Sequence, residues 1–169
     1  MSAHERHASD GFSVETHPIE GAALLQEAVE SVELEAVRLD VRLHWHSPVG
    51  DSLLVNADPR RVLQVLANLL NNALRFTPEG GTIKCTAQRE GKFVRFSVID
   101  TGPGIPAEKL PRLFDPLHQT NADTHKGSGR SLAVCKGLVA AHGGRIWVES
   151  LPEVGAAFNF TLPAVLTPP

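Results

Sequence analysis

The sequence predicts an α+β fold, a two-layer sandwich in which about three helices cover one face of a mixed, mostly antiparallel sheet. Two observations carry this prediction. Strand-like alternation recurs in pairs joined by short turns, and three stretches with helical spacing of apolar residues stand between the strands. The 169 residues suffice for one domain with a substantial core. We expect that domain at 12–163, after a disordered lead or cloning remnant at 1–11 and before a tail at 164–169.

The first half of the domain alternates strand and helix patterns. Residues 12–17 alternate apolar and polar side chains, as a short strand does, and Pro18 then opens a helical stretch. Two further strands are expected at 41–46 and 52–56, joined by a turn region that contains Pro and Gly. Helical spacing in the first stretch predicts a buried stripe of Ala22, Leu25, Val29, Val32 and Ala36.

A second helix is expected from Asp58 to about Phe76. Asp is a favoured N-cap residue, and Pro59 fits the first helical turn, where an N–H group would be unpaired anyway. The remaining elements are strands at 82–88, 93–99, 145–150 and 157–162, with a turn at 89–92, a short helix at 107–113 and a longer one from about 128 to 142.

This second helix carries a polar stripe beside its apolar one. At about 100° per residue, Asn68, Asn72 and Arg75 align. An Asn oxygen is a ligand that Mg²⁺ accepts, and a guanidinium offers fixed, charged donors suited to phosphate. The stripe indicates a surface for a metal–triphosphate, and an ordinary solvated helix face is the alternative. The apolar stripe, which should face the sheet, consists of Val62, Leu66, Leu69 and Ala73.

A glycine-bearing loop follows the strand that ends at 99. It begins with Asp100, whose carboxylate could accept a hydrogen bond from an exocyclic amine such as that of adenine. Gly102 and Gly104 would let the backbone approach a ligand closely. The alternative is a capped turn that leads into a helix at Pro106.

The third long helix starts in a Gly/Ser segment, at Gly127, Ser128 and Gly129. Free N–H groups at a helix N-terminus bind anions, and the helix dipole assists them. The polar residues at 115–126 are numerous enough for a lid over a ligand. A flexible linker is the alternative.

Composition excludes several classes of function. The net charge of -3 argues against an electrostatic grip on nucleic acid or an anionic membrane. We find no apolar run near the roughly 20 residues of a membrane span, and no signal-peptide pattern. Cys85 and Cys135 are expected to be reduced, buried thiols of a cytoplasmic protein rather than a disulfide.

In order and spacing, these segments resemble the catalytic domain of histidine kinases, within the ATPase superfamily that includes DNA gyrase. The resemblance covers about 12–162. Residues 68–78 resemble the N box, 100–106 the G1 box, 113–117 the F box and 127–132 the G2 box.

This resemblance implies ATP and Mg²⁺ as cofactors. Asn72 would hold the metal, Asn68 and Arg75 would act with it in catalysis, and Asp100 would recognise the adenine amine. The other nucleotide-binding positions that it implies are Phe76, Gly102, Gly104, Ile105, Phe114, Lys126, Gly127, Ser128, Gly129, Arg130, Ser131 and Leu132.

The kinase branch is favoured over gyrase-like ATPases, which place a general-base Glu where this chain has Asn68. An amide cannot take a proton from water. Within the G2 box, Arg130 and Ser131 replace the usual Leu and Gly, and Leu117 replaces a usual Phe. A degenerate domain that acts through protein contacts, and a stand-alone serine kinase that regulates a transcription factor, are therefore the alternative functions.

None of the eight histidines has the context of a kinase acceptor. We therefore expect γ-phosphoryl transfer to a histidine on a dimerisation hairpin absent from this chain, with a response regulator as the further partner. Contact of this domain with nucleic acid or membrane is not expected, and the isolated domain should be a monomer. It should lie in the cytoplasm, either free or as the cytoplasmic part of a membrane-bound sensor.

Overall fold

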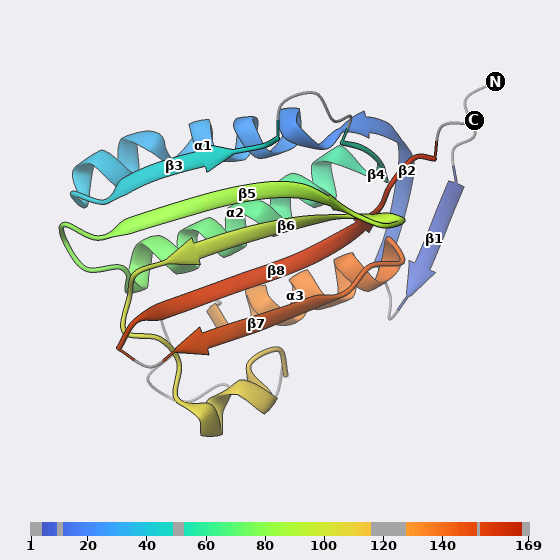
Figure 1. Ribbon diagram of the computed structural model, residues 1–169. Coiled ribbons are helices and arrows are strands. Elements are labelled where there is room, and N and C mark those ends of the chain that lie inside the picture. The colour runs from blue at the N-terminus through green and yellow to red at the C-terminus, as the bar shows by residue number, and fades with distance from the viewer. Residues whose placement is uncertain (1–4, 10–11, 49–52, 116–127, 152, 167–169) are drawn as a thin grey trace.

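A computed structural model describes residues 5–9, 12–48, 53–115, 128–151 and 153–166. Its main sheet has five strands in the order β3-β5-β6-β8-β7 (Figure 1). Only the β3–β5 pair is parallel, and the other three pairs are antiparallel. The strands are β3 (Arg42–His46), β5 (Thr82–Glu90), β6 (Phe93–Asp100), β8 (Gly155–Pro163) and β7 (Ile146–Leu151).

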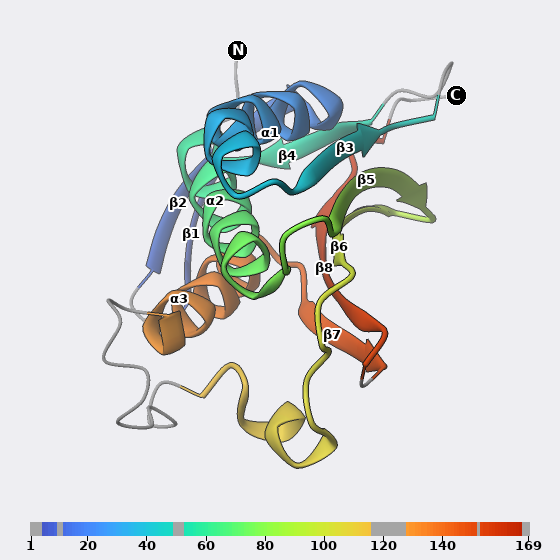
Figure 2. The same cartoon turned by 90° about the vertical axis from the view of Figure 1, so that its left-hand side faces the viewer.

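Three long helices lie on one face of this sheet, as Figures 1 and 2 show, which confirms the predicted two-layer α+β sandwich. They are α1 (Gly21–Arg38), α2 (Pro59–Phe76) and α3 (Ser128–Ala141). A short 3-10 helix, η1 (Ala107–Arg112), follows the glycine-bearing loop near the predicted position. Within the described part of the chain, no helix is both long and apolar enough to cross a membrane.

The core fills the space between the helices and the inward face of the sheet. The predicted stripe of α2 is buried completely, with every member at 1% exposure or less. Phe96 of β6 and Phe160 of β8 stack with ring centroids 5.0 Å apart beneath the helices. Apolar side chains at alternate strand positions face this layer, as period-two patterning requires. They include Ile83, Cys85, Ala87, Val94, Val98, Phe158 and Leu162.

A second, small sheet was not anticipated from the sequence. Its order is β1-β2-β4, with β1 at Glu5–Ser9, β2 at Phe12–Glu20 and β4 at Leu54–Ala57. The sequence predicts a disordered lead over 1–11, whereas β1 pairs with β2 in antiparallel register. Main-chain hydrogen bonds make this pairing, so a polar sequence gives little sign of it.

One expectation about the first half is wrong. Pro18 does not open a helix: it lies in β2 opposite Asn56, beyond the part of β2 that pairs with β1, where a missing N–H is tolerated. The helix begins at Gly21, whose N–H donates to the Leu53 carbonyl at 2.9 Å. The strands expected at 41–46 and 52–56 form, with slightly shifted bounds, but they belong to different sheets.

The entry of the chain into β2 also touches α3. Phe12 is half-buried, and its ring lies directly over Gly137 of α3. A Cβ atom built on Gly137 would stand 2.1 Å from Cε2 of that ring. The bare backbone of α3 at this point is therefore what admits the aromatic ring.

Candidate functional site

Asp100 ends β6 with its carboxylate held from several sides. Its Oδ1 accepts a hydrogen bond from the N–H of Gly102 at 2.9 Å, and only 7% of the residue is exposed. Across the sheet it pairs with Ala156 of β8. Gly155 crowds its carbonyl so closely that a Cβ there would lie 2.1 Å from the Asp100 oxygen. The position of this carboxylate is thus fixed by the backbone around it.

Burial also changes the acidity of this group. Loss of water around the carboxylate raises the pKa of Asp100 above its ordinary value. Hydrogen bonds from the N–H groups of Gly102 and Ala156 oppose that shift by stabilising the charged form. A buried, partly satisfied carboxylate at a strand end suits the recognition of a ligand N–H group.

The glycine-bearing loop is clamped against α2 and β7. A Cβ on Gly102 would lie 3.0 Å from the Phe76 carbonyl, so the loop passes close to the C-terminus of α2. Gly104 has a φ of 77°, a conformation that favours glycine. On the other side, the Ile105 N–H donates to the Ser150 hydroxyl at 2.6 Å. The first two predicted site segments therefore meet at Phe76 and Gly102.

The polar stripe of α2 is present, and its members contact one another. Asn72 is half-buried, and its Oδ1 accepts a hydrogen bond from Nη2 of Arg75 at 3.1 Å. The Arg75 guanidinium also lies over the Phe76 ring, with Cζ 4.9 Å from the centroid. Phe76 itself is 53% exposed. An amide oxygen, a guanidinium and an open aromatic face are thus offered side by side.

α3 runs antiparallel to α2, and the contacts between the two helices show which part of α2 lies beside the N-terminus of α3. Near one end, Nε2 of His142 accepts the Asp58 N–H at 3.1 Å; farther along, Cys135 contacts Asn68. Ser128 precedes Cys135 by seven residues, and Arg75 follows Asn68 by seven. With equal rise per residue, about 1.5 Å, the start of α3 lies level with Arg75. The N-terminus of α3 and the polar stripe of α2 therefore border the same space.

The remaining predicted positions divide into two groups. Phe114 is half-buried and meets the Phe158 ring edge-on at 6.4 Å, and Leu132 is 5% exposed. Lys126 and Gly127 lie outside the described residues. The backbone of Ser128, Gly129, Arg130 and Ser131 forms the first turn of α3, but their side chains also lie outside the description.

Sequence reasoning missed four residues that position the site. Thr101 joins the loop to β5, since its Oγ1 accepts the Thr82 N–H at 2.9 Å. Ser150 holds the loop at Ile105, and Gly155 permits the close pairing at Asp100. Cys135 contacts the polar stripe from α3. Each acts through a long-range contact, so local patterning carries no sign of it.

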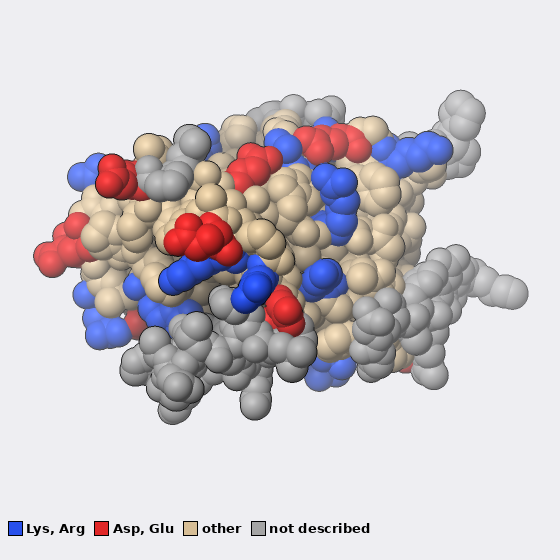
Figure 3. Space-filling view, turned by 90° about the horizontal axis from the view of Figure 1, so that it is seen from below, with Lys and Arg blue, Asp and Glu red and all other residues tan. Residues whose placement is uncertain are grey.

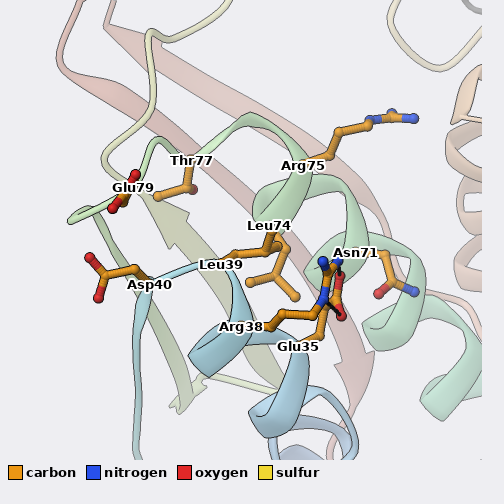
Figure 4. A pocket seen from close by; sticks show the side chains of 9 residues that line it. All are labelled: Glu35, Arg38, Leu39, Asp40, Asn71, Leu74, Arg75, Thr77 and Glu79. Carbon is orange, nitrogen blue, oxygen red and sulfur yellow. Dashed lines mark hydrogen bonds and ion pairs between the residues drawn. The ribbon is translucent and has the colours of Figure 1, made fainter.

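A groove of about 640 Å³ lies on another side of α2 (Figure 4). Arg75 is its one member from the polar stripe, and that side chain extends away from the other lining groups. Leu39 and Leu74 lie between the carboxylates of Asp40 and Glu79 and the Glu35–Arg38 ion pair. The groove is thus a neighbour of the candidate site rather than part of it.

Charges of both signs are interspersed on the face drawn in Figure 3, over the part that the structure describes.

This chain matches a protein family, curated relatives and solved structures. Residues 57–166 match the family described as Histidine kinase-, DNA gyrase B-, and HSP90-like ATPase. The adaptive-response sensory kinase SasA of Synechococcus sp. (strain CC9311) is 47% identical over 147 residues, which are 83% of this chain and 38% of SasA. The chain therefore spans well under half the length of this curated relative.

Solved histidine kinases share the fold. The catalytic domain of ThkA is 32% identical, with a TM-score of 0.79 over 89% of this chain and 96% of that one. ThkA in complex with the response regulator TrrA matches with 30% identity and a TM-score of 0.76, over 90% and 43% of the two chains. Full-length ShkA in complex with AMPPNP matches with 31% identity and a TM-score of 0.81, over 92% and 32%.

Proposed function

Because this chain belongs to the histidine kinase-, DNA gyrase B- and HSP90-like ATPase family, we propose that it binds Mg·ATP between α2, α3 and the loop after β6. The γ-phosphoryl then passes to a histidine outside this chain. The convergence of Asp100, the stripe of α2 and the N-terminus of α3 at one end of the domain is the observation that carries this proposal. The AMPPNP complex of ShkA, a relative with the same fold, supports it.

Asp100 is the proposed reader of adenine. Its buried carboxylate would accept a hydrogen bond from the exocyclic amine, which guanine lacks at that position. Gly102 and Gly104 would let the backbone approach the base, and the apolar groups of Phe76, Ile105 and Phe114 would flank the nucleotide.

Asn72 and Arg75 are the proposed phosphate end of the site. Asn72 Oδ1 is a hard oxygen donor of the kind that Mg²⁺ accepts. Asn72 is only half-buried, so this oxygen is accessible and fits the metal. Bound Mg²⁺ would neutralise charge on the β- and γ-phosphates. Oδ1 has two lone pairs, so one can bind the metal while the other keeps the bond from Arg75, or the Arg75 guanidinium can turn to the phosphates.

The backbone at the start of α3 would complete the phosphate site. The N–H groups of the first turn of a helix and the helix dipole favour anions, and this turn lies at the level of Arg75. Gly127 and Gly129 would admit the phosphate oxygens, and Lys126, Ser128, Arg130, Ser131 and Leu132 are the other proposed contacts.

Positioning and electrostatics dominate phosphoryl transfer, so the chain needs no nucleophile of its own. A ring nitrogen of the acceptor histidine attacks the γ-phosphorus, and the bond to the β,γ-bridging oxygen breaks, which leaves ADP. Asn68 stands where a general base would activate water, and its amide cannot take that proton. Hydrolysis by the isolated chain should therefore be slow.

The acceptor is proposed to sit on a dimerisation hairpin, and a response regulator to receive the phosphoryl group next. The crystallised ThkA–TrrA complex and the longer SasA relative support this proposal. Without a hairpin, the chain studied alone should be a monomer, which light scattering can measure.

Isothermal titration calorimetry with Mg·ATP tests the proposed site. The wild-type chain should bind, and Asp100→Asn should weaken binding by roughly 10- to 100-fold, the range expected for a hydrogen bond to a charged group. Asp40→Asn, an exposed aspartate of the neighbouring groove, is the matched control and should bind normally.

Binding that Asp100→Asn leaves intact would remove Asp100 from the adenine site. If the wild type fails to bind at millimolar nucleotide, the degenerate reading suggested by Arg130 and Ser131 replaces this proposal.

A further inference from the structure

Cys135 lies in the middle of α3 with no exposed surface, and its sulfur faces two groups of α2. The Sγ atom stands 3.9 Å from the Val65 carbonyl oxygen and 3.7 Å from Nδ2 of Asn68. These contacts join the buried side of α3 to the polar stripe of α2. Burial raises the pKa of this thiol to about 12, so it stays protonated at neutral pH.

In both contacts the donor is defined. The Cys135 thiol donates its hydrogen to the Val65 carbonyl, which can only accept. The sulfur lone pairs then face Asn68, where only the NH₂ side of the amide can meet them as a donor. A flipped amide would bring its oxygen to the sulfur, and the S–H would then have to leave Val65 to supply a hydrogen. The pair of contacts therefore favours Nδ2 of Asn68 toward the thiol.

We propose that Cys135 is a positioning residue of the nucleotide site, which holds the Asn68 amide with Nδ2 toward α3 and Oδ1 turned away from the thiol. This inference rests on the proposed function, because Asn68 is useful in one orientation only if a ligand reads it.

The chain offers a matched control in its other thiol. Cys85 is also completely buried, and burial likewise raises its pKa to about 12. It lies in β5, however, and faces the core rather than the interface of α2 and α3. Replacing either sulfur by alanine should cost similar stability, but only Cys135 should affect the site.

The experiment compares Cys135→Ala, Cys135→Ser and Cys85→Ala by calorimetry with Mg·ATP and by the side-chain NH₂ signals of Asn68 in ¹⁵N NMR spectra. Cys135→Ala should weaken Mg·ATP by about fivefold, the equivalent of one hydrogen bond, and should shift the Asn68 signals. Cys135→Ser keeps a donor and an acceptor, so both readouts should return toward wild type. Cys85→Ala should leave both unchanged.

Wild-type affinity and unmoved Asn68 signals in Cys135→Ala would overturn the inference. Equal loss of affinity in Cys85→Ala would also overturn it, because general destabilisation would then explain the effect. The NMR readout is made on the nucleotide-free chain, so it reports the thiol–amide contact separately. A wild type that fails to bind Mg·ATP refutes the proposed function and this inference together; a binding wild type with an insensitive Cys135→Ala refutes only the inference.

Discussion

Asp100 and Arg75 lie at the two ends of the candidate site, and the protein holds them in opposite ways. Asp100 is buried, receives N–H groups of neighbouring backbone and is crowded by Gly155. Arg75 is exposed and engages only its helical neighbours, the Asn72 amide and the Phe76 ring, in the contacts that the described residues show. The first group is built into the sheet, and the second is carried on a helix surface.

This difference separates a rigid end from an adjustable one. A ligand group that meets Asp100 finds its partner already in place, so binding there orders little of the protein. At the other end, Asn72 and Arg75 contact each other on an open helix surface, and Arg75 can change its partner when phosphates arrive. Selectivity for the base should therefore depend on the sheet, and metal dependence on the helix.

The largest effect, a loss of stability, is expected when an atom is added beside Asp100 at the rigid end of the site. Gly155→Ala would place a Cβ 2.1 Å from the Asp100 carbonyl oxygen, so the β6–β8 pairing must shift. We expect a loss of about 3 kcal/mol in the free energy of unfolding, measured in urea. Gly91→Ala is the control: that glycine also has a positive φ, 62°, but open space around it, and should lose only about 1 kcal/mol. Equal losses would mean that backbone conformation, not the contact at Asp100, matters.

At the adjustable end, Asn72→Ala should lower Mg·ATP affinity about tenfold, because one metal ligand is lost. Affinity for ATP in the presence of a chelator should change much less. Asn71→Ala removes the neighbouring amide, which lines the groove on another side of α2, and should be neutral in both titrations. Calorimetry with and without Mg²⁺ makes the comparison. An Asn72→Ala variant that loses both affinities equally would show that this amide contacts the nucleotide rather than the metal.

The smallest effect is a dependence on pH. Burial raises the pKa of Asp100, so it takes up a proton at a higher pH than an ordinary aspartate. ATP affinity should fall a few-fold as the pH drops through that raised value, since the ionised form is the better acceptor. Stability should change in the opposite sense: its Asp100 contribution decreases as the pH rises from the ordinary to the raised pKa. Asp100→Asn should abolish both dependences, and a variant that retains them would assign them to another group.

Local pattern predicted most of the helices and strands, and it suggested the candidate site residues. The burial stripe of α2, the hairpin of β5 and β6 and the end of α3 near Gly143 follow the spacing of apolar residues and glycines. The hairpin turn is shorter than 89–92 because β5 continues to Glu90. Asp100 could be singled out because it begins a glycine-bearing loop, and Asn72 because it lies on a polar stripe of a predicted helix.

What could not be predicted depends on contacts between distant segments. Pro18 suggested a helix start because its place in the sheet, opposite Asn56, is invisible in the sequence. The roles of Ser150 and Cys135 likewise need partners 45 and 67 residues away. The predicted capping role of Asp58 is also altered by such a contact: its side chain makes no cap hydrogen bond to α2, and Oδ2 accepts the Glu15 N–H instead.

The ring of Phe12 over Gly137 has a consequence for how this sequence can vary. The two residues are 125 positions apart, yet each limits what the other can become, since any Cβ at 137 meets the ring at 2.1 Å. A related chain with a larger residue at 137 must either carry a smaller side chain at 12 or lead the chain into β2 along another path. Positions 12 and 137 should therefore change together among relatives, as a linked pair that records how the N-terminal strand rests on the third helix.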